Sequence, residues 1–466
     1  ALFQGGAHAE ANAMGSCLGS LVGSCCASLA CKACSCQCDA GTLFAHYIYV
    51  FLITIAAGAA LGLRYSGVDL NVGNSVGGWG TPSVCPGPLP CDGLSYSICN
   101  SPACTGYWSV YRISFSIAVF FALMLLFTAC KSTFSAKLHR GYWGPKVFLI
   151  LAIGASAIFM PNDVFAVYAW ISRFVAPLFI LFSLTMFIDF GYKTSNYFVE
   201  KDEREDVFFG CANGGNTYKV VLLLASICLV VGSCVASGYL YANDYASCGF
   251  GMAAITTNLV FSIINVIIGL SKVAPHASPF VSALVFGYAT FTTFDAISSW
   301  PEEDCNPSLR NSGLGITIVS CCIAAIAIGY IASNINRWTQ TNTEIATGGL
   351  GKTGADEVTV EVVDDSSADG KEVEPHSFGF YHLLMLAVSM YLAMLLTDWG
   401  VEHGSPADSA GASTRHNVGE TSAWIKLVFA WVCNGLYFWT LVAPRCCPNR
   451  DFGVEVEPLC EDGPCS

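Results

Sequence analysis

The chain has 466 residues, of which 54% are hydrophobic and only 12% are charged, and its mean hydropathy is +0.54. A soluble domain carries about 25% charged residues, so this composition excludes a soluble globular protein and indicates one that crosses a membrane several times. The formal net charge of −13 argues against nucleic acid as a partner, because an acidic chain repels a polyanion.

Ten apolar runs predict an all-α polytopic membrane protein with about ten transmembrane helices. The runs are Phe44–Leu63, Ile113–Cys130, Val147–Met160, Phe174–Ile188, Val220–Tyr239, Ala253–Leu270, Phe280–Ile297, Leu314–Ala332, Tyr381–Leu396 and Ala423–Val442. A bilayer core needs about 20 mostly apolar residues, so most runs span it unaided, whereas the third, fourth and ninth are short. The fourth run extends in both directions, which predicts one long oblique helix from Asn162 to about Asp206, kinked at Pro177.

The positively charged residues predict the orientation, since Lys and Arg favour cytosolic loops. When the loops are assigned alternately to the two sides, fifteen of the 21 Lys and Arg residues fall on the side of the termini. We therefore expect a multi-pass protein of the plasma membrane or an endomembrane, with both termini in the cytosol.

The same pattern divides the chain into segments. They are a Cys-rich cytosolic N-terminus at 1–42, transmembrane helices one to eight at 43–334 with an outer loop at 65–108, an acidic and disordered cytosolic loop at 335–377, the last two helices at 378–444, and a cytosolic tail at 445–466. Residues 1–13 are expected to be foreign, because LFQG at 2–5 looks like part of a protease-cleavage linker and Met14 resembles a natural initiator.

Cysteines in the outer loop predict disulfide bonds. The 65–108 loop contains no Lys or Arg and, in the expected orientation, faces an oxidising compartment, where disulfides persist. Four cysteines allow three pairings, which stay open: Cys85, Cys91, Cys99 and Cys104. A metal site is the weaker alternative, because no histidine lies nearby. Cys305, in another outer loop, either pairs with a remaining outer cysteine or stays free.

The stretch CKACSCQC places four further cysteines just before the first apolar run. Cytosolic disulfides are disfavoured, and the crowded spacing does not suit the two separated ligand pairs of a zinc ribbon. Juxtamembrane cysteines among small residues suit reversible S-acylation, so the acylation candidates are Cys31, Cys34, Cys36 and Cys38. Plain packing of small apolar residues and metal binding remain the alternatives.

Two short patterns imitate enzyme motifs without the required context. GGLGKTG at Gly348–Gly354 resembles a phosphate-binding loop, but Ala346 stands where the first glycine is required. His403 and Asp408 repeat the spacing of some acyltransferases, in a polar loop with no oxyanion site. We therefore expect no enzymatic activity, no catalytic residue, no bound metal and no cofactor.

Charged residues are nearly absent from the centres of the apolar runs, which argues against an ion-coupled transporter. The runs contain milder polarity instead: Asn258 and Asn265 are seven residues apart and so share one helical face. We assign Asn258, Asn265 and Asp295 to a weakly polar groove that is open to lipid. Hydrogen bonding between helices is the alternative role for these side chains.

Three basic residues lie near the ends of the apolar runs: Arg112, Arg173 and Lys193. At a membrane surface, basic side chains attract the phosphate and carboxylate groups of lipids. We predict that these residues contact such groups at the two ends of the groove, with interfacial anchoring as the alternative.

Six segments resemble the serine incorporator (SERINC) family, also called TMS proteins, in order along nearly the whole chain. They are GYWSVYRISFSIAVFF (106–121), LHRGYWGPK (138–146), LTMFIDFGY (184–192), CNPSL (305–309), FYHLLMLAVSMYLAMLLTDW (380–399), and WIKLVFAWVCNGLYFWTLVAP with NRDF (424–452). The resemblance implies ten helices in two bundles separated by a long oblique helix. It also implies lipid bound in a groove between the bundles.

This resemblance implies a non-enzymatic protein that binds phospholipid and acts as an ATP-independent lipid scramblase or as a facilitator of phosphatidylserine and sphingolipid metabolism. A serine carrier and a scaffold for lipid-synthesis enzymes are the alternatives. The implied partners are phospholipids, sterol, further copies of the chain and lipid-synthesis enzymes. The Cys-rich N-terminus, CCPN at Cys446–Asn449 and the long acidic loop depart from the pattern of the animal members.

Overall fold

The computed structural model describes residues 41–65, 102–130, 132–160, 162–203, 217–274, 276–302, 305–307, 314–346, 378–399 and 419–446. These residues form eleven helices and no strand. Nine of the described helices are long and apolar enough to cross a membrane, or ten if one bent pair forms a single span. The all-α polytopic class expected from the sequence is confirmed.

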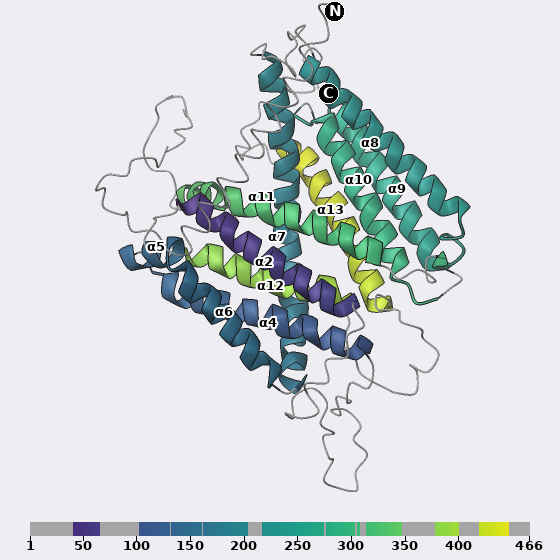
Figure 1. The fold of residues 1–466 in the computed structure, drawn as a ribbon. Coiled ribbons are helices and arrows are strands. Elements are labelled where there is room, and N and C mark those ends of the chain that lie inside the picture. Colours follow the sequence, from purple (N-terminus) through teal and green to yellow (C-terminus); the bar gives the residue numbers. More distant parts are fainter. Residues whose placement is uncertain are drawn as a thin grey trace, which may run out of the picture.

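The long helix α7 (Asn162–Glu203) separates two groups of helices (Figure 1). The first bundle contains α2 (Thr42–Tyr65), α4 (Pro102–Thr128), α5 (Thr133–Arg140), α6 (Trp143–Ile158), α11 (Leu314–Ala346) and α12 (Gly379–Thr397). The second bundle contains α8 (Thr217–Ala242), α9 (Gly249–Leu270), α10 (Pro279–Ser298) and α13 (Glu420–Cys446). Packing is most extensive between α4 and α12 in the first bundle and between α10 and α13 in the second.

Helix α7 matches the long helix predicted from the sequence and continues through Pro177. A proline inside a helix removes one backbone hydrogen bond, and membrane helices tolerate this where neighbouring helices cover the site. Helix α7 packs on α4, α11 and α12 on one side and on α8, α10 and α13 on the other. It is therefore the main connection between the bundles.

The third predicted span is short, as the sequence indicates, and a second helix precedes it at a sharp bend. Helix α6 has only 16 residues, or about 24 Å of rise, which is less than the roughly 30 Å of a bilayer core. The preceding helix α5 meets it at 72°. The bend lies at Gly141 and Tyr142 between the two helices, where Tyr142 adopts the left-handed conformation with φ 59° and the backbone cannot continue as one helix.

Helix α11 continues to Ala346, well into the segment 335–377 that the sequence predicts as a disordered loop. No proline or glycine interrupts the chain between 330 and 346, so the helical backbone hydrogen bonds can continue after the apolar run has ended. Helix α11 therefore extends beyond the apolar run, which ends at Ala332.

Large apolar side chains cover the outer faces of both bundles, for example Phe148, Leu178 and Ile326, each more than 60% exposed. A soluble monomer rarely exposes so much contiguous apolar surface. Lipid chains are the natural solvent for these faces, which agrees with a membrane-spanning protein.

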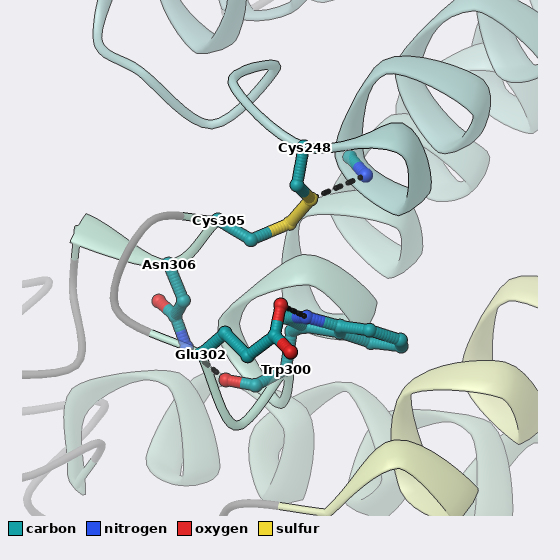
Figure 2. The surroundings of a disulfide bond; sticks show 6 residues. Cys248, Trp300, Glu302, Cys305 and Asn306 are labelled. Carbon is teal, nitrogen blue, oxygen red and sulfur yellow. Dashed lines mark hydrogen bonds between the residues drawn. A yellow bond between two sulfur atoms is a disulfide. The ribbon is translucent and has the colours of Figure 1, made fainter.

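A disulfide joins Cys305 to Cys248, with 5.1 Å between the two Cα atoms. Cys248 also caps α9, because its sulfur accepts a hydrogen bond from the Gly251 N–H at 3.2 Å. Figure 2 shows the disulfide and, as a dashed line, the hydrogen bond to the Cys248 sulfur. Asn306, fully buried beside the bond, donates to the carbonyl oxygens of Ser298 and Trp300. The bond thus holds the segment after α10 against the start of α9.

The other predicted cysteine sites are not described. The disulfide candidates Cys85, Cys91 and Cys99 and the acylation candidates Cys31, Cys34, Cys36 and Cys38 lie outside the described residues. Cys104 lies in α4, but the surroundings of its side chain are not described. These assignments stay predictions.

Candidate functional site

An ion triad joins the two bundles where α10 and α12 end. The Lys426 Nζ atom of α13 lies 3.0 Å from Asp295 Oδ1 and 2.7 Å from Asp398 Oδ1. It also donates a hydrogen bond to Ser299 Oγ at 2.7 Å. The three charged side chains are 12%, 14% and 5% exposed, so the two carboxylates and the single ammonium lie largely out of solvent.

Local backbone geometry positions the triad. Asp398 follows the last residue of α12 in the left-handed conformation, with φ 53°, and its N–H closes the helix on the Met394 carbonyl. Asp and Asn adopt this conformation more readily than other residues with a side chain. Ser422, in the first turn of α13, donates to Asp398 Oδ1 at 2.8 Å. The end of α12 is thereby tied to the start of α13.

A polar pocket with a volume of about 20 Å³ lies against the triad. Its lining comes from both bundles: Asp295, Ser298 and Ser299 of the α10 end, Ile316, Thr317 and Ser320 of α11, Leu395 and Asp398 of the α12 end, and Lys426 of α13. A volume of this size accommodates about one water-sized group. The pocket therefore marks the junction of the bundles and has room for a small polar ligand.

Three buried oxygens at this pocket have no hydrogen-bond partner among the described residues: Asp398 Oδ2, Ser298 Oγ and Ser320 Oγ. A buried polar group without a partner destabilises the fold by about 1–3 kcal/mol. A ligand that contacted these oxygens would remove that penalty.

The predicted groove residues Asn258 and Asn265 lie inside the second bundle, 1% and 3% exposed. The Asn258 amide donates to Thr290 Oγ1 of α10 at 3.1 Å. The Asn265 amide donates to the carbonyl and side-chain oxygens of Asn434 of α13, and Ser262 also donates to the Asn434 side chain. In this structure the two asparagines therefore make hydrogen bonds between helices, which is the alternative role given above for these side chains. Contact with lipid stays a prediction.

We expect Asn434→Leu to lower the free energy of unfolding by about 1–2 kcal/mol, because donors of Ser262 and Asn265 lose their shared acceptor. Denaturation by SDS in mixed micelles measures the change. Asn243→Leu is the matched control, since this exposed asparagine bonds only within its own turn. A control as destabilised as Asn434→Leu would contradict the assigned role of the network.

The two predicted outer arginines both bind backbone carbonyls. Arg112, 3% exposed, donates to the carbonyls of Ala157 and Met160 at the end of α6, where the helix dipole favours a cation. Arg173 donates to the carbonyl of Trp399, next to Asp398 in the chain, at 2.8 Å. These contacts are typical of anchoring residues, and contact with a lipid phosphate stays a prediction.

Lys193 lies at the other end of α7, far along the helix from Arg173. Its Nζ atom is 2.8 Å from Asp189 Oδ2, and Tyr330 of α11 donates to the same oxygen at 2.6 Å. The ion pair is about 40% exposed, so solvent screens it and it contributes little to stability. Lys193 is the most accessible of the three predicted basic contacts.

Three histidines from α2, α5 and α12 form a cluster that the sequence does not predict. His46, His139 and His382 are at most 1% exposed, and the His139 Nδ1 and His382 Nε2 atoms are 3.1 Å apart. Within the described chain, no group of His, Cys, Asp and Glu is arranged to hold a metal ion. The rings instead pack against aromatic neighbours: His46 stacks on Tyr381, and His139 stacks on Phe378.

The comparisons with known proteins agree with one another. A model of the family described as "Serine incorporator (Serinc)" matches residues 20–450. The chain is 26% identical to "Serine incorporator 2" of Mus musculus over 474 residues, covering 94% of this chain and 100% of that one. It is 26% identical to "Probable serine incorporator" of Nematostella vectensis over 402 residues, covering 78% and 84%. It is 24% identical to "Membrane protein TMS1" of Saccharomyces cerevisiae over 406 residues, covering 76% and 83%.

Proposed function

The chain belongs to the serine incorporator family, and from that premise we propose that it binds phospholipid and lets headgroups cross the membrane between its two bundles without using ATP. The family description does not name an enzyme, and we propose no catalytic residue. Passive movement of this kind would redistribute lipids made from serine, phosphatidylserine among them, between the two leaflets.

The observation that carries this proposal is the sparse packing between the bundles. Among the described helices, none of the first bundle packs closely along a helix of the second, and α7 supplies most of the connection. Direct bridges include the triad and the contact of Trp399 with Phe429 near the α12 end. Buried apolar residues of α7 lie in one cluster with residues of α4 and α12 from the first bundle and of α10 and α13 from the second. An interface with few packed contacts opens at a low free-energy cost.

Polar groups at both ends of the junction support the proposal. Burying a charged headgroup in hydrocarbon is strongly unfavourable, and side chains that hydrogen-bond it lower the barrier. Asp295 and the serines of the pocket lie at one end, and the exposed Asp189–Lys193 pair lies at the other. The short helix α6 adds a second effect, since a span shorter than the bilayer thins it locally.

The disulfide supports the proposed orientation. Cys248 and Cys305 lie in connections at the same end of the second bundle as Asp295. Disulfides persist in the lumen or outside the cell and are disfavoured in the cytosol. We therefore place the triad toward the lumen or exterior and both termini in the cytosol.

The test is a dithionite assay on liposomes that contain the purified full chain and fluorescent phosphatidylserine or phosphatidylcholine, without ATP. Dithionite bleaches only the outer leaflet, so lipid passage is seen as bleaching well beyond the outer-leaflet half. Bleaching that stops at that half, in vesicles shown to contain folded protein, would rule out intrinsic scrambling.

We expect Ser320→Leu to slow lipid passage about three- to tenfold, because an apolar side chain replaces a hydroxyl at the junction. Ser156→Leu on α6 is the matched control, since Ser156 is exposed away from the pocket. Its rate should equal that of the wild type. Equal rates for both variants would place the lipid path elsewhere.

The two other functions make different predictions. A serine carrier would show saturable uptake of radiolabelled serine into the same liposomes. A scaffold would show neither activity and would bind lipid-synthesis enzymes or further copies of the chain. Failure of lipid passage together with saturable serine uptake would favour the carrier.

A further inference from the structure

We infer that the pocket at the bundle junction is a binding site for one monovalent cation of the size of Na⁺. This inference does not rest on lipid passage, since a cation held between Asp398 and the serines would bind in a scramblase, a carrier or a scaffold alike. It rests on the charge, the chemistry and the size of the pocket.

The first argument is charge. Asp295 and Asp398 carry two negative charges, and Lys426 supplies one positive charge. The three N–H groups of the Lys426 ammonium are matched by three acceptors, the two carboxylates and Ser299 Oγ. The triad by itself has a net charge of −1, which is unfavourable out of solvent unless it is paired. Arg173, which binds the Trp399 carbonyl, is a further cation near the triad, and it donates there to a backbone oxygen and not to a carboxylate. One monovalent cation would neutralise the site, whereas a divalent cation would leave it positive.

The second argument is ligand chemistry. The oxygens without a partner are one carboxylate oxygen, of a side chain only 5% exposed, and the hydroxyls of Ser298 and Ser320. Carboxylate and hydroxyl oxygens suit hard cations, and transition metals prefer imidazole or thiolate groups. No His or Cys lines this pocket. Na⁺ therefore fits this set of ligands and zinc or copper does not.

The third argument is the direction of the helices. Helices α10 and α12 both end at the pocket, with Ser298 and Thr397 as their last residues. The C-terminal end of a helix carries about half a negative charge, and such ends coordinate Na⁺ in membrane proteins. Two converging helix ends add negative potential to the excess carboxylate.

The fourth argument is size. The volume of about 20 Å³ exceeds the roughly 10–15 Å³ that one water-sized group needs. A dehydrated Na⁺ ion fits this volume, whereas the methyl groups of choline keep its charge away from oxygen ligands. Because Ser320 belongs to the first bundle and Ser298 to the second, a bound ion would connect the two bundles.

The test is thermal unfolding of the full chain in micelles, followed by tryptophan fluorescence, in NaCl and in choline chloride at equal ionic strength. A ligand that binds only the folded state raises the Tm in a saturable way, so we expect the Tm to rise with Na⁺ and not with choline. Equilibrium dialysis with ²²Na⁺ should give saturable binding. Equal Tm values in the two salts, with no retained ²²Na⁺, would mean that the pocket holds water and would overturn the inference.

Variants locate the site. Ser320→Ala should weaken ²²Na⁺ binding about tenfold, the effect of losing one oxygen ligand. Asp398→Asn should abolish the binding. If this variant does not fold, Ser320→Ala still decides the question. Ser226→Ala on α8, where the serine bonds only to Leu222 of its own helix, is the matched control and should bind as the wild type does. Unchanged binding in Ser320→Ala would overturn the assignment to this pocket.

Discussion

Replacing Lys426 with glutamine is expected to lower the free energy of unfolding by about 3–5 kcal/mol, because it leaves two buried carboxylates without their ammonium partner. The loss exceeds that of an ordinary surface ion pair, since Lys426, Asp295 and Asp398 are all less than 15% exposed. Denaturation by SDS in mixed micelles, monitored by tryptophan fluorescence, measures the change.

Two controls separate this effect from a loss of packing. Lys219→Gln removes a lysine that is 45% exposed and lies 3.8 Å from Asp202, so it should change stability by less than about 1 kcal/mol. A triple variant with uncharged side chains of similar shape should recover part of the lost free energy of unfolding. Its substitutions are Lys426→Gln, Asp295→Asn and Asp398→Asn. If Lys426→Gln and Lys219→Gln lowered the free energy of unfolding by similar amounts, the buried triad would contribute no more to stability than an exposed ion pair.

Removing the Cys248–Cys305 disulfide is expected to lower the free energy of unfolding by about 2–4 kcal/mol. The bond closes a loop across 57 residues of sequence that includes α9 and α10. Without the bond, the unfolded chain gains conformational entropy, so the folded state is less stable. Denaturation of Cys305→Ala, compared with the wild type under oxidising conditions, measures the loss.

The double variant Cys248→Ala, Cys305→Ala should be no less stable than Cys305→Ala, because one bond is lost in each case. Reduction of the wild type should reproduce the effect. Cys234→Ala, at an exposed free cysteine of α8, is the control and should change stability little. A double variant much less stable than the single one would assign the effect to packing around the thiols.

Much of the fold could be predicted because a bilayer imposes strict requirements on the chain. Every backbone polar group in hydrocarbon must bond within the protein, so long apolar runs become helices. This rule predicted α8, α9 and α10 to within a few residues and predicted α7 as one long helix. It also predicted α6 as a short span to within a few residues, but it misjudged the end of α11, where the helix continues past the apolar run.

The site could be predicted only in part. Asp295 was assigned to a polar groove from its place near the end of an apolar run, but Lys426 and Asp398 were not assigned to the site. Asp295 and Lys426 are separated by 131 residues, and no spacing rule connects residues on different helices over such a distance. The opposite charges of Asp295 and Asp398 and of Lys426, all near the outer ends of apolar runs, are a signal that could have suggested the pairing.

The asparagines show where the sequence alone stops being informative. Spacing in the chain determined that Asn258 and Asn265 share one face of α9, because the helix repeats every 3.6 residues. Whether that face meets lipid or another helix depends on how α9 packs against α10 and α13, and the structure places Asn434 of α13 there. Local hydrogen bonding and hydrophobicity determine the helices of this protein, whereas the contacts between their faces form only when distant segments pack together, so tertiary structure alone decided them.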